Sequence, residues 1–399
     1  MRHTTPNAWW LAAVIAVAPA LTAARPGPQQ PSGHLRAIGA RLVRADGTAF
    51  AWRGITAFRL LEHLAAGREG EVVAYLDWAA AERLTVVRVL TMASHLFTLA
   101  PEDGVARLDR LLDLAAARGL FVEVIALADT ASADVDLARH VAAVGAVCAR
   151  HPNALLELAN EPDHPTQHPD LARPETLAAL RGLVPPEVPV AVGAVEDPVV
   201  LGAGDYVTLH VDRGRSDDPW AHVWAVVEAY DRVDPLDLPV INDEPIGAGE
   251  SRVPGHRDTD PSRFRAVALL SRFLGMGATF HYESGLNGRI PQGVEAACLA
   301  GWLDAWRVLP EDFEARARFR GSPGPDGPLA GLEAGPAARL FEVEAGSARW
   351  VLGLAVTDDV RPVVREGWRV AGIWQWPGVW LAQFAESSSG PEFFVEPAA

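Results

Sequence analysis

The segment LLELANEP (residues 155–162) is a short apolar run that ends in an asparagine, a glutamate and a proline. An apolar run of this length is typical of a strand buried on both faces, as in a parallel sheet. Pro162 has no N–H with which to continue the strand, so we expect Asn160 and Glu161 at its carboxyl end. The segment PVINDEP (residues 239–245) repeats the pattern and places Glu244 before a proline.

Outward from these two segments, apolar or β-branched runs alternate with helical patterns. The expected strands begin near Trp52, Thr85, Phe121, Ala154, Val188, Tyr206, Pro239 and Ala278, most of them 33 to 39 residues apart. The interval from Val188 to Tyr206 is too short for a full helix. Eight strands alternating with helices predict an α/β fold, a (β/α)8 (TIM) barrel, over residues 35–310. A doubly wound open sheet is the alternative, but no glycine-rich phosphate-binding turn follows the first strand.

The amino-terminal residues are expected to form an export signal, a linker and a hairpin. Residues 1–24 contain Arg2, an apolar run and small residues before a cleavage point, so we expect a secreted or periplasmic protein. The apolar run is short for a membrane span, and no stable membrane insertion is expected after cleavage; an uncleaved form is the alternative. Residues 25–34 are the linker. Beyond it, the runs 37–44 and 49–52 flank an Ala45-Asp46-Gly47 turn, which predicts a hairpin.

The carboxyl-terminal residues change from helical to strand patterns. Residues 311–336, which include GSPGPDGP, are expected to be a linker or long loop, and residues 337–399 a small tryptophan-rich β domain. This part carries five tryptophans: Trp350, Trp368, Trp374, Trp376 and Trp380. We expect them to form its core and its contact with the barrel, since so small a domain needs large side chains; an aromatic platform for sugar is the alternative.

Composition and charge exclude several function classes. The sequence contains no lysine, so Walker-type phosphate loops and internal Schiff bases are excluded. The formal net charge of −16 disfavours nucleic acid and anionic lipid as partners, whereas a neutral carbohydrate is compatible with it. No cofactor is expected. Cys148 and Cys298 lie in helical patterns and are expected to be buried and unbridged.

Catalytic groups of such a barrel lie at the carboxyl ends of its strands, so the polar residues that end the apolar runs are the candidates. These are Arg88, Asn160, Glu161, His210, Asn242, Asp243, Glu244, His281, Tyr282 and Glu283. Strand alternation puts Asp243 on the face opposite Glu244, so Glu244 is preferred. Hydrolysis of an acetal needs one carboxylic acid and one carboxylate, and Glu161 and Glu244 supply this pair.

A metal site is the other reading of this region, because His151, His164 and His168 lie close together in the sequence. Prolines at 165 and 169 break any helix that would align the last two, and no HExxH motif is present. We therefore expect surface histidines and no metal.

The motifs resemble those of the clan A glycoside hydrolases, nearest the cellulase-like family five, over most of residues 38–308. Asn160-Glu161-Pro162 matches the family's strand-four motif, which implies that Glu161 is the acid/base and that Asn160 binds the sugar hydroxyl next to the reacting carbon. The resemblance further implies that Glu244 is the nucleophile and that Arg88, in TVVRVL, keeps it ionised. His210 matches the first position of the strand-six His-x-Tyr motif.

Departures from the family pattern concern the sugar contacts. Asp212 replaces the motif tyrosine, and Tyr282 is the candidate to replace its hydroxyl. Strand three ends in IALADTAS without the family's histidine, and strand eight ends in HYES without its tryptophan, which leaves His281, Tyr282 and Glu283 as candidate substrate contacts.

Together these features predict a secreted retaining glycoside hydrolase that cleaves a β-linked oligo- or polysaccharide by double displacement. The same intermediate intercepted by a sugar hydroxyl would make the protein a transglycosylase. A non-catalytic carbohydrate-binding or interaction protein on a degenerate glycosidase barrel is the alternative from another class. For Arg88 and His210, purely structural roles stay open: Arg88 as the neutralising partner of a glutamate, and His210 as a hydrogen-bonded core histidine.

Overall fold

The computed structural model describes residues 31–94, 97–211, 218–250, 257–324, 326–357 and 360–387. The predicted signal (residues 1–24), most of the predicted linker and Asp212 lie outside the described residues.

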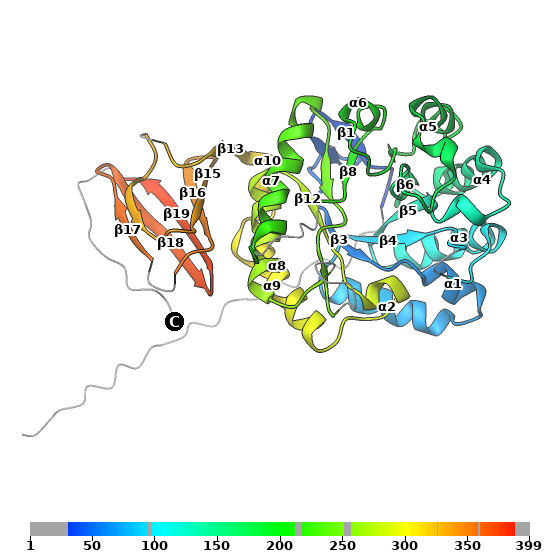
Figure 1. Cartoon of the computed structure of the whole chain (residues 1–399), viewed down its shortest axis with the longest axis horizontal. Coiled ribbons are helices and arrows are strands. Elements are labelled where there is room, and N and C mark those ends of the chain that lie inside the picture. Colours follow the sequence, from blue (N-terminus) through cyan, green and yellow to red (C-terminus); the bar gives the residue numbers. More distant parts are fainter. Residues whose placement is uncertain are drawn as a thin grey trace, which may run out of the picture.

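Eight parallel strands form the centre of the molecule (Figure 1). Their hydrogen-bonded order is β7-β6-β5-β4-β3-β12-β9-β8. Their bounds are β3 Arg53–Thr56, β4 Val86–Leu90, β5 Phe121–Leu127, β6 Ala154–Ala159, β7 Val190–Ala191, β8 Val207–Leu209, β9 Val240–Asn242 and β12 Gly277–Phe280. Each predicted strand is present, and the predicted (β/α)8 fold is confirmed.

Helices connect successive strands and cover the outside of the sheet. Their bounds are α1 Leu60–Ala65, α2 Glu69–Ala81, α3 Pro101–Ala116, α4 Leu137–Arg150, α5 Pro174–Arg181, α6 Pro198–Leu201, α7 Ala221–Val233, α8 Pro261–Phe273, α9 Val294–Val308 and α10 Phe313–Arg316. Local chemistry explains several starts: the Asp136 side chain caps α4 by accepting from the Arg139 N–H, and Asp260 caps α8 just before Pro261. The interval predicted to be too short for a full helix holds the single turn α6.

Strand alternation divides the barrel interior into layers. Phe121, Leu155 and Tyr206 belong to an apolar cluster inside the sheet. Two positions further along these strands, the interior residues are Glu123, Glu157 and Thr208, all fully buried. A polar layer therefore lies above an apolar layer, because successive inward positions are two residues apart.

The amino-terminal hairpin differs in detail from the prediction. The run 37–44, expected as one strand, is split into β1 (Arg36–Ile38) and β2 (Arg41–Val43), which pair antiparallel. The chain reverses at Gly39, which adopts a φ of 53° that glycine allows without strain. The expected turn at 45–47 is also present, and Val43 bridges to Ala49 across it.

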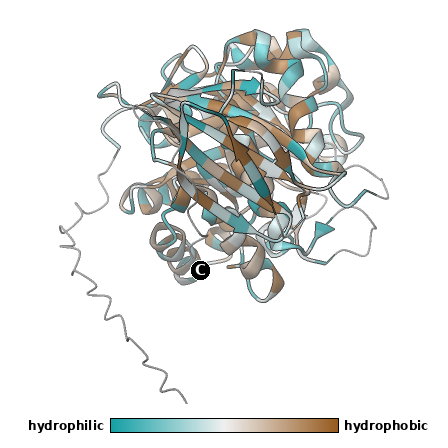
Figure 2. Ribbon diagram, turned by 90° about the vertical axis from the view of Figure 1, so that its left-hand side faces the viewer, coloured by the Kyte–Doolittle hydropathy of each residue, from teal (hydrophilic) through white to brown (hydrophobic). Residues whose placement is uncertain are grey.

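The carboxyl-terminal part is an antiparallel β structure that packs against the barrel helices (Figure 1). Five strands pair in the order β13-β15-β16-β19-β18, with bounds β13 Ala317–Gly321, β15 Arg339–Ala345, β16 Ala348–Leu354, β18 Trp368–Trp376 and β19 Val379–Glu386. A second sheet pairs β14 (Leu329–Glu333) with β17 (Arg361–Val364). Figure 2 shows hydropathy alternating along the strands of this part.

Both faces of the five-stranded sheet bury apolar side chains. Trp350 and Leu352 belong to the cluster that continues into the barrel helices, whereas Val351 and Phe384 belong to a cluster within the β structure. The rings of Trp350 and Phe313 meet edge to face, with their centroids 5.7 Å apart. The prediction that the tryptophans form the core and the barrel contact is confirmed, since each of the five is buried or half-buried.

Two small elements complete the fold: β10 (Gly247–Ala248) pairs with β11 (Arg257–Asp258) in the loop between β9 and α8. Cys148 and Cys298 are both buried and free. Within the described ranges, no helix is both long enough and apolar enough to cross a bilayer.

Candidate active site

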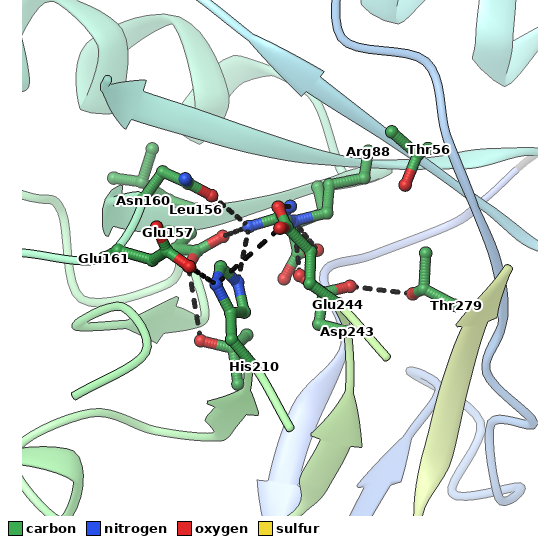
Figure 3. A network of polar contacts seen from close by, with 12 residues as sticks. Thr56, Arg88, Leu156, Glu157, Asn160, Glu161, His210, Asp243, Glu244 and Thr279 are labelled. Atoms are coloured by element: carbon green, nitrogen blue, oxygen red, sulfur yellow. Dashed lines mark hydrogen bonds and ion pairs between the residues drawn. The ribbon is translucent and has the colours of Figure 1, made fainter. Parts of the chain in front are cut away.

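Several barrel strands, and the residues that directly follow them, bring a network of charged side chains together (Figure 3). Arg88, in the middle of β4, is fully buried at its centre. Its Nη2 donates to Glu157 at 2.7 Å and to Asn160 Oδ1 at 2.8 Å, and its Nη1 donates to Glu244. Its Nε pairs with Asp243 and lies 3.4 Å from Glu123. One guanidinium thus faces four carboxylates, and these carboxylates raise its pKa although burial alone would lower it.

The end of β9 corrects the prediction that Asp243 faces away from Glu244. Both residues contact Arg88, and Asp243 also accepts from Thr279 Oγ1 at 2.7 Å. The N–H groups of Asp243 and Glu244 both donate to Leu209 O, at 3.0 and 3.2 Å. Two residues opposite one carbonyl are the mark of a β-bulge, and a bulge breaks the alternation of side chains. Asn242 instead points outward and donates to Ser271 of α8.

Glu161 and Glu244 converge on His210, which follows β8. The hydrogen bond between His210 Nδ1 and Glu161 Oε1 measures 2.9 Å, and Nδ1 lies 3.8 Å from Glu244 Oε2. One oxygen of each glutamate and one nitrogen of His210 lie within 4.8 Å of one another. The structure therefore brings the two predicted glutamates together.

The two glutamates have different surroundings. The Glu244 side chain is 6% exposed and contacts Arg88, whereas the Glu161 side chain is 31% exposed and contacts His210. A guanidinium beside a buried carboxylate favours its ionised form. Two carboxyl groups in unlike environments can serve as acid and as nucleophile.

The backbone at Glu161 is strained. Its φ of 50° is in the left-handed region, which costs a non-glycine residue about 1–3 kcal/mol. The strain persists because Asn160, just before it, is held on both sides: its N–H donates to Leu127 O at 2.9 Å and its carbonyl accepts from Gln167. The fold thus places this side chain at the mouth of the barrel against a local preference.

The protonation of His210 depends on its neighbours. Arginine only donates, so Arg88 Nη2, 3.3 Å from Nε2, favours the neutral ring with its proton on Nδ1, where it is donated to Glu161. Burial also favours the neutral ring, but Glu244 and Glu161 outweigh it and raise the pKa of His210 above its ordinary value. Protonation of Glu161 would remove the nearer negative charge, so the proton inventories of Glu161 and His210 are linked.

Glu123 and Glu157 are site residues that the sequence analysis missed. Both point into the barrel from strands that are otherwise apolar, FVEVIAL and ALLELA. Burial, followed by the Asp243 charge, raises the pKa of Glu123 well above its ordinary value, and Tyr206 donates to it at 2.9 Å. Burial likewise raises the pKa of Glu157, although Arg88 opposes the shift. A lone acid inside an apolar parallel strand was the available signal, because it must find a buried partner.

The strand-eight residues are placed in three different ways. His281 is buried beside Phe58, and its Nδ1 is 3.0 Å from Thr56 Oγ1. Glu283 is 44% exposed at the rim and pairs with Arg257 at 2.7 Å. The expectation for Tyr282 is wrong: the side chain is fully buried, and its hydroxyl contacts Tyr75 at 2.9 Å and donates to Arg289 O at 2.6 Å. Tyr282 therefore does not steady Glu244 or face the mouth.

Among the residues that the structure describes, two sets have the spacing of metal ligands, and they share His210. One set is Glu157, His210 and Asp243, and the other is Glu161, His210 and Glu244. In each set a carboxylate already pairs with Arg88, which supplies positive charge at this point. The three histidines considered from the sequence lie elsewhere: His151 contacts Asp109, His164 contacts Thr166, and His168 lies 3.7 Å from Asp170.

Comparison with known proteins gives structural matches. No protein-family model matches this sequence, and no curated protein matches it. A candidate glycoside hydrolase from Bacteroides vulgatus superposes with a TM-score of 0.57 at 12% identity, covering 89% of this chain and 82% of that one. A β-glucanase from Saccharophagus degradans, solved with cellotetraose, gives 0.55 at 12%, covering 71% and 97%. An endo-1,4-β-mannanase from Rhizomucor miehei gives 0.51 at 14%, covering 69% and 99%. The chain therefore shares the barrel fold of these three proteins.

Proposed function

We propose that this protein is a retaining glycoside hydrolase that acts on a β-linked oligo- or polysaccharide, with Glu161 as acid/base and Glu244 as nucleophile. The observation that carries the proposal is the pair of carboxylate oxygens from β6 and β9 within 4.8 Å of each other. Carboxyl groups of retaining enzymes are about 5–5.5 Å apart, whereas inverting enzymes leave about 6.5–9.5 Å for a water molecule.

Hydrolysis then proceeds in two displacements. In the first, Glu161 donates its proton to the glycosidic oxygen while Glu244 attacks the anomeric carbon, so the bond to the leaving group breaks and a glycosyl ester forms on Glu244. In the second, Glu161 as a base takes a proton from water, the water oxygen bonds to the anomeric carbon, and the ester bond to Glu244 breaks. The second step returns both carboxyl groups to their starting states.

The surrounding residues prepare each partner for its part. Arg88 pairs with Glu157 and Asp243 and directs Nη1 at Glu244, which keeps the nucleophile ionised. Asn160 Oδ1 accepts from Arg88, so its amide nitrogen is the group left to donate to a sugar hydroxyl. His210 is hydrogen-bonded to Glu161, so the protonation of His210 is linked to that of Glu161 in the two displacements.

The substrate class and the location are part of the same proposal. The structural relatives include a β-glucanase bound to cellotetraose and an endo-1,4-β-mannanase, which supports a β-linked glucan or mannan as substrate here. The apolar amino-terminal run after Arg2 supports export, and an extracellular or periplasmic enzyme would meet such polysaccharides. Double displacement by two carboxyl groups requires no cofactor.

Turnover of β-glucan, mannan, xylan and galactan and of their 4-nitrophenyl β-glycosides tests the proposal. We expect Glu161→Ala and Glu244→Ala each to lower kcat by at least about a thousandfold on the accepted polysaccharide, with the folded state retained. The exposed Glu187, changed to alanine, is the matched control and should keep wild-type rates. Saccharide binding by the wild type without turnover of any substrate would instead favour the non-catalytic carbohydrate-binding alternative.

A further inference from the structure

Asp129 occupies the strand end next to Glu161. It lies two residues beyond Leu127 of β5, and Glu161 lies two residues beyond Ala159 of β6. Leu127 and Ala159 are partners in the parallel register, so the two acidic residues continue matched positions at the same edge of the barrel. β5 is the third strand of the barrel, and its end in IALADTAS lacks the histidine of the family that the sequence resembles.

Asp129 and Glu161 share an unfavourable backbone conformation. Asp129 has φ 53° and ψ 45°, and Glu161 has φ 50°. The other non-glycine residues with positive φ in the described ranges, Arg83, Asp237 and Ala355, follow a helix, a 3-10 turn and a strand away from this network. Two adjacent strand ends therefore both hold an acidic residue under strain, and such strain concentrates at functional sites.

The segment after Asp129 is fixed to the loop after Glu161. Thr130 Oγ1 donates to Gln167 Oε1 at 2.8 Å and accepts from the His168 N–H at 2.7 Å. On the other side, Ser94 Oγ donates to Asp129 O at 2.6 Å. These bonds hold the Asp129 backbone rigidly without using its carboxylate.

The Asp129 side chain is largely enclosed, but its carboxylate makes no bond within the described part of the protein. Asp129 is only 8% exposed, and it makes no side-chain cap bond to the 3-10 turn that follows it. Over the part of the chain that the structure describes, its carboxylate has no hydrogen-bond or ion-pair partner. The preceding residue, Ala128, belongs to an apolar cluster with Phe58 and Phe97. Neither Asp129 carboxylate oxygen is among the solvent-excluded polar atoms of the described residues, so both stay accessible to accept hydrogen bonds from a ligand.

We propose that Asp129 is a specificity-determining residue that accepts hydrogen bonds from hydroxyl groups of the saccharide unit bound beside Glu161. This assignment rests on the proposed function for its substrate class. A carboxylate accepts two hydroxyl hydrogens at once, and the surrounding apolar side chains strengthen each bond by lowering the local dielectric constant. Asp129 thereby selects sugars that carry hydroxyls at the matching ring positions.

The test compares Asp129→Asn with wild type and with Asp237→Asn. Asparagine tolerates the left-handed conformation and keeps the shape of the side chain, and Asp237 has the same conformation (φ 49°, ψ 41°) on an exposed turn. We expect Asp129→Asn to lower kcat/KM on the best 4-nitrophenyl β-glycoside by about tenfold to a hundredfold. Its melting temperature should equal that of wild type, because the carboxylate makes no bond within the described part of the protein. Asp237→Asn should match wild type in kinetics.

Monodeoxy substrates separate recognition from a merely structural effect. At least one of the 2-, 3-, 4- and 6-deoxy analogues should react more slowly than the parent glycoside with wild type, and the same analogue should show no further loss with Asp129→Asn. Equal kcat/KM for Asp129→Asn and wild type, or additive losses for every analogue, would overturn the assignment and leave the proposed function intact.

Calorimetric binding of cellotetraose and mannotetraose covers the case in which the wild type hydrolyses nothing. Binding that Asp129→Asn weakens at least about tenfold would uphold the assignment while ending the proposed function. Equal affinities for Asp129→Asn and wild type, or no binding by the wild type, would overturn the assignment.

Discussion

At the scale of single residues, the site depends on how buried charge is shared around Arg88. Its guanidinium faces Glu123, Glu157, Asp243 and Glu244, so negative groups outnumber it inside the barrel. Such an excess is tolerable only if a carboxyl group keeps its proton. Burial and the Asp243 charge raise the pKa of Glu123 well above its ordinary value, so Glu123 is the group we expect to be neutral.

This assignment predicts a pH-dependent penalty on stability. Because the pKa of Glu123 is raised, the folded protein holds a proton that the unfolded chain releases above its ordinary value of 4.5, so stability falls as pH rises from 4.5 through the raised pKa. Glu123→Gln removes the penalty and keeps an acceptor for Tyr206. Its free energy of unfolding should exceed that of wild type at pH 7. The difference should grow by about 1.4 kcal/mol for each pH unit between 4.5 and the raised pKa of Glu123, and it should vanish near pH 4.

Urea unfolding at pH 4 to 8 measures this difference. Glu69→Gln, on an exposed glutamate paired with Arg110, is the control and should show no gain at neutral pH. A Glu123→Gln advantage that is constant with pH, or that grows toward acid, would contradict the assignment.

The sequence predicted the two glutamates that the structure brings together, but not the buried charge network around Arg88. Glu161 and Glu244 could be predicted because each precedes a proline at the end of an apolar run. Glu123 and Glu157 lie inside strands, where alternation tells which way they point but not that Arg88 from β4 reaches both of them. That contact depends on the stagger of neighbouring strands, which no pattern within one strand encodes.

At the scale of elements, strand periods predicted the barrel well and failed where a strand stops being regular. All eight strands and the main helices follow from periodicity. Asp243 faces inward by alternation with Ile241, whereas the bulge at the end of β9 places Glu244 beside it. For Tyr282, by contrast, regular alternation gives the right orientation. Thr279 points inward to Asp243, so His281 also points inward. Tyr282 therefore points outward, where its ring stacks on Phe280. The family resemblance suggested that the Tyr282 hydroxyl replaces that of the motif tyrosine, but strand alternation turns this side chain away from the site.

Arg272 joins the helices α8, α9 and α10 through its hydrogen bonds and its ion pair. Arg272 at the end of α8 is fully buried and donates to Ala305 O at 2.7 Å and to Pro310 O at 2.6 Å, and it pairs with Glu314 of α10. Arg272→Met leaves these acceptors without donors in the interior, so we expect a loss of about 3–5 kcal/mol in the free energy of unfolding.

Chemical denaturation compares this variant with Arg307→Met. Arg307 pairs with Asp304 on the surface and is 60% exposed, so its loss should cost less than about 1 kcal/mol. Similar losses for the two variants would show that Arg272 does not join α8, α9 and α10.

At the scale of the whole molecule, the carboxyl-terminal β structure covers a helix that the barrel alone would expose. Most of α8 is buried on every side, including Arg265, whose guanidinium lies 4.8 Å from the Trp376 ring. A surface helix of an isolated barrel would instead have one polar face. The sequence predicted that the tryptophans form a contact with the barrel, but which helix they cover depends on packing between distant segments.

Removing residues 317–399 should therefore destabilise the barrel. We expect the remaining chain to lose at least about 10 °C in melting temperature and to aggregate, because the outer face of α8 becomes an exposed apolar patch. Scanning calorimetry and light scattering measure both effects. A truncated chain as stable and monomeric as the full one would show that the β structure is an independent attachment.

Azide rescue of the two glutamate variants tests the central claim, the opposed roles of Glu161 and Glu244, most directly. With an activated 4-nitrophenyl β-glycoside, Glu244→Gly should regain activity in azide and release the α-glycosyl azide, because azide takes the place of the nucleophile. Glu161→Ala should release the β-glycosyl azide, because azide attacks the intermediate on Glu244 in place of water. NMR spectra of the products showing these two anomers are the predicted result; the opposite assignment, the same anomer from both variants, or no rescue of either would contradict the account.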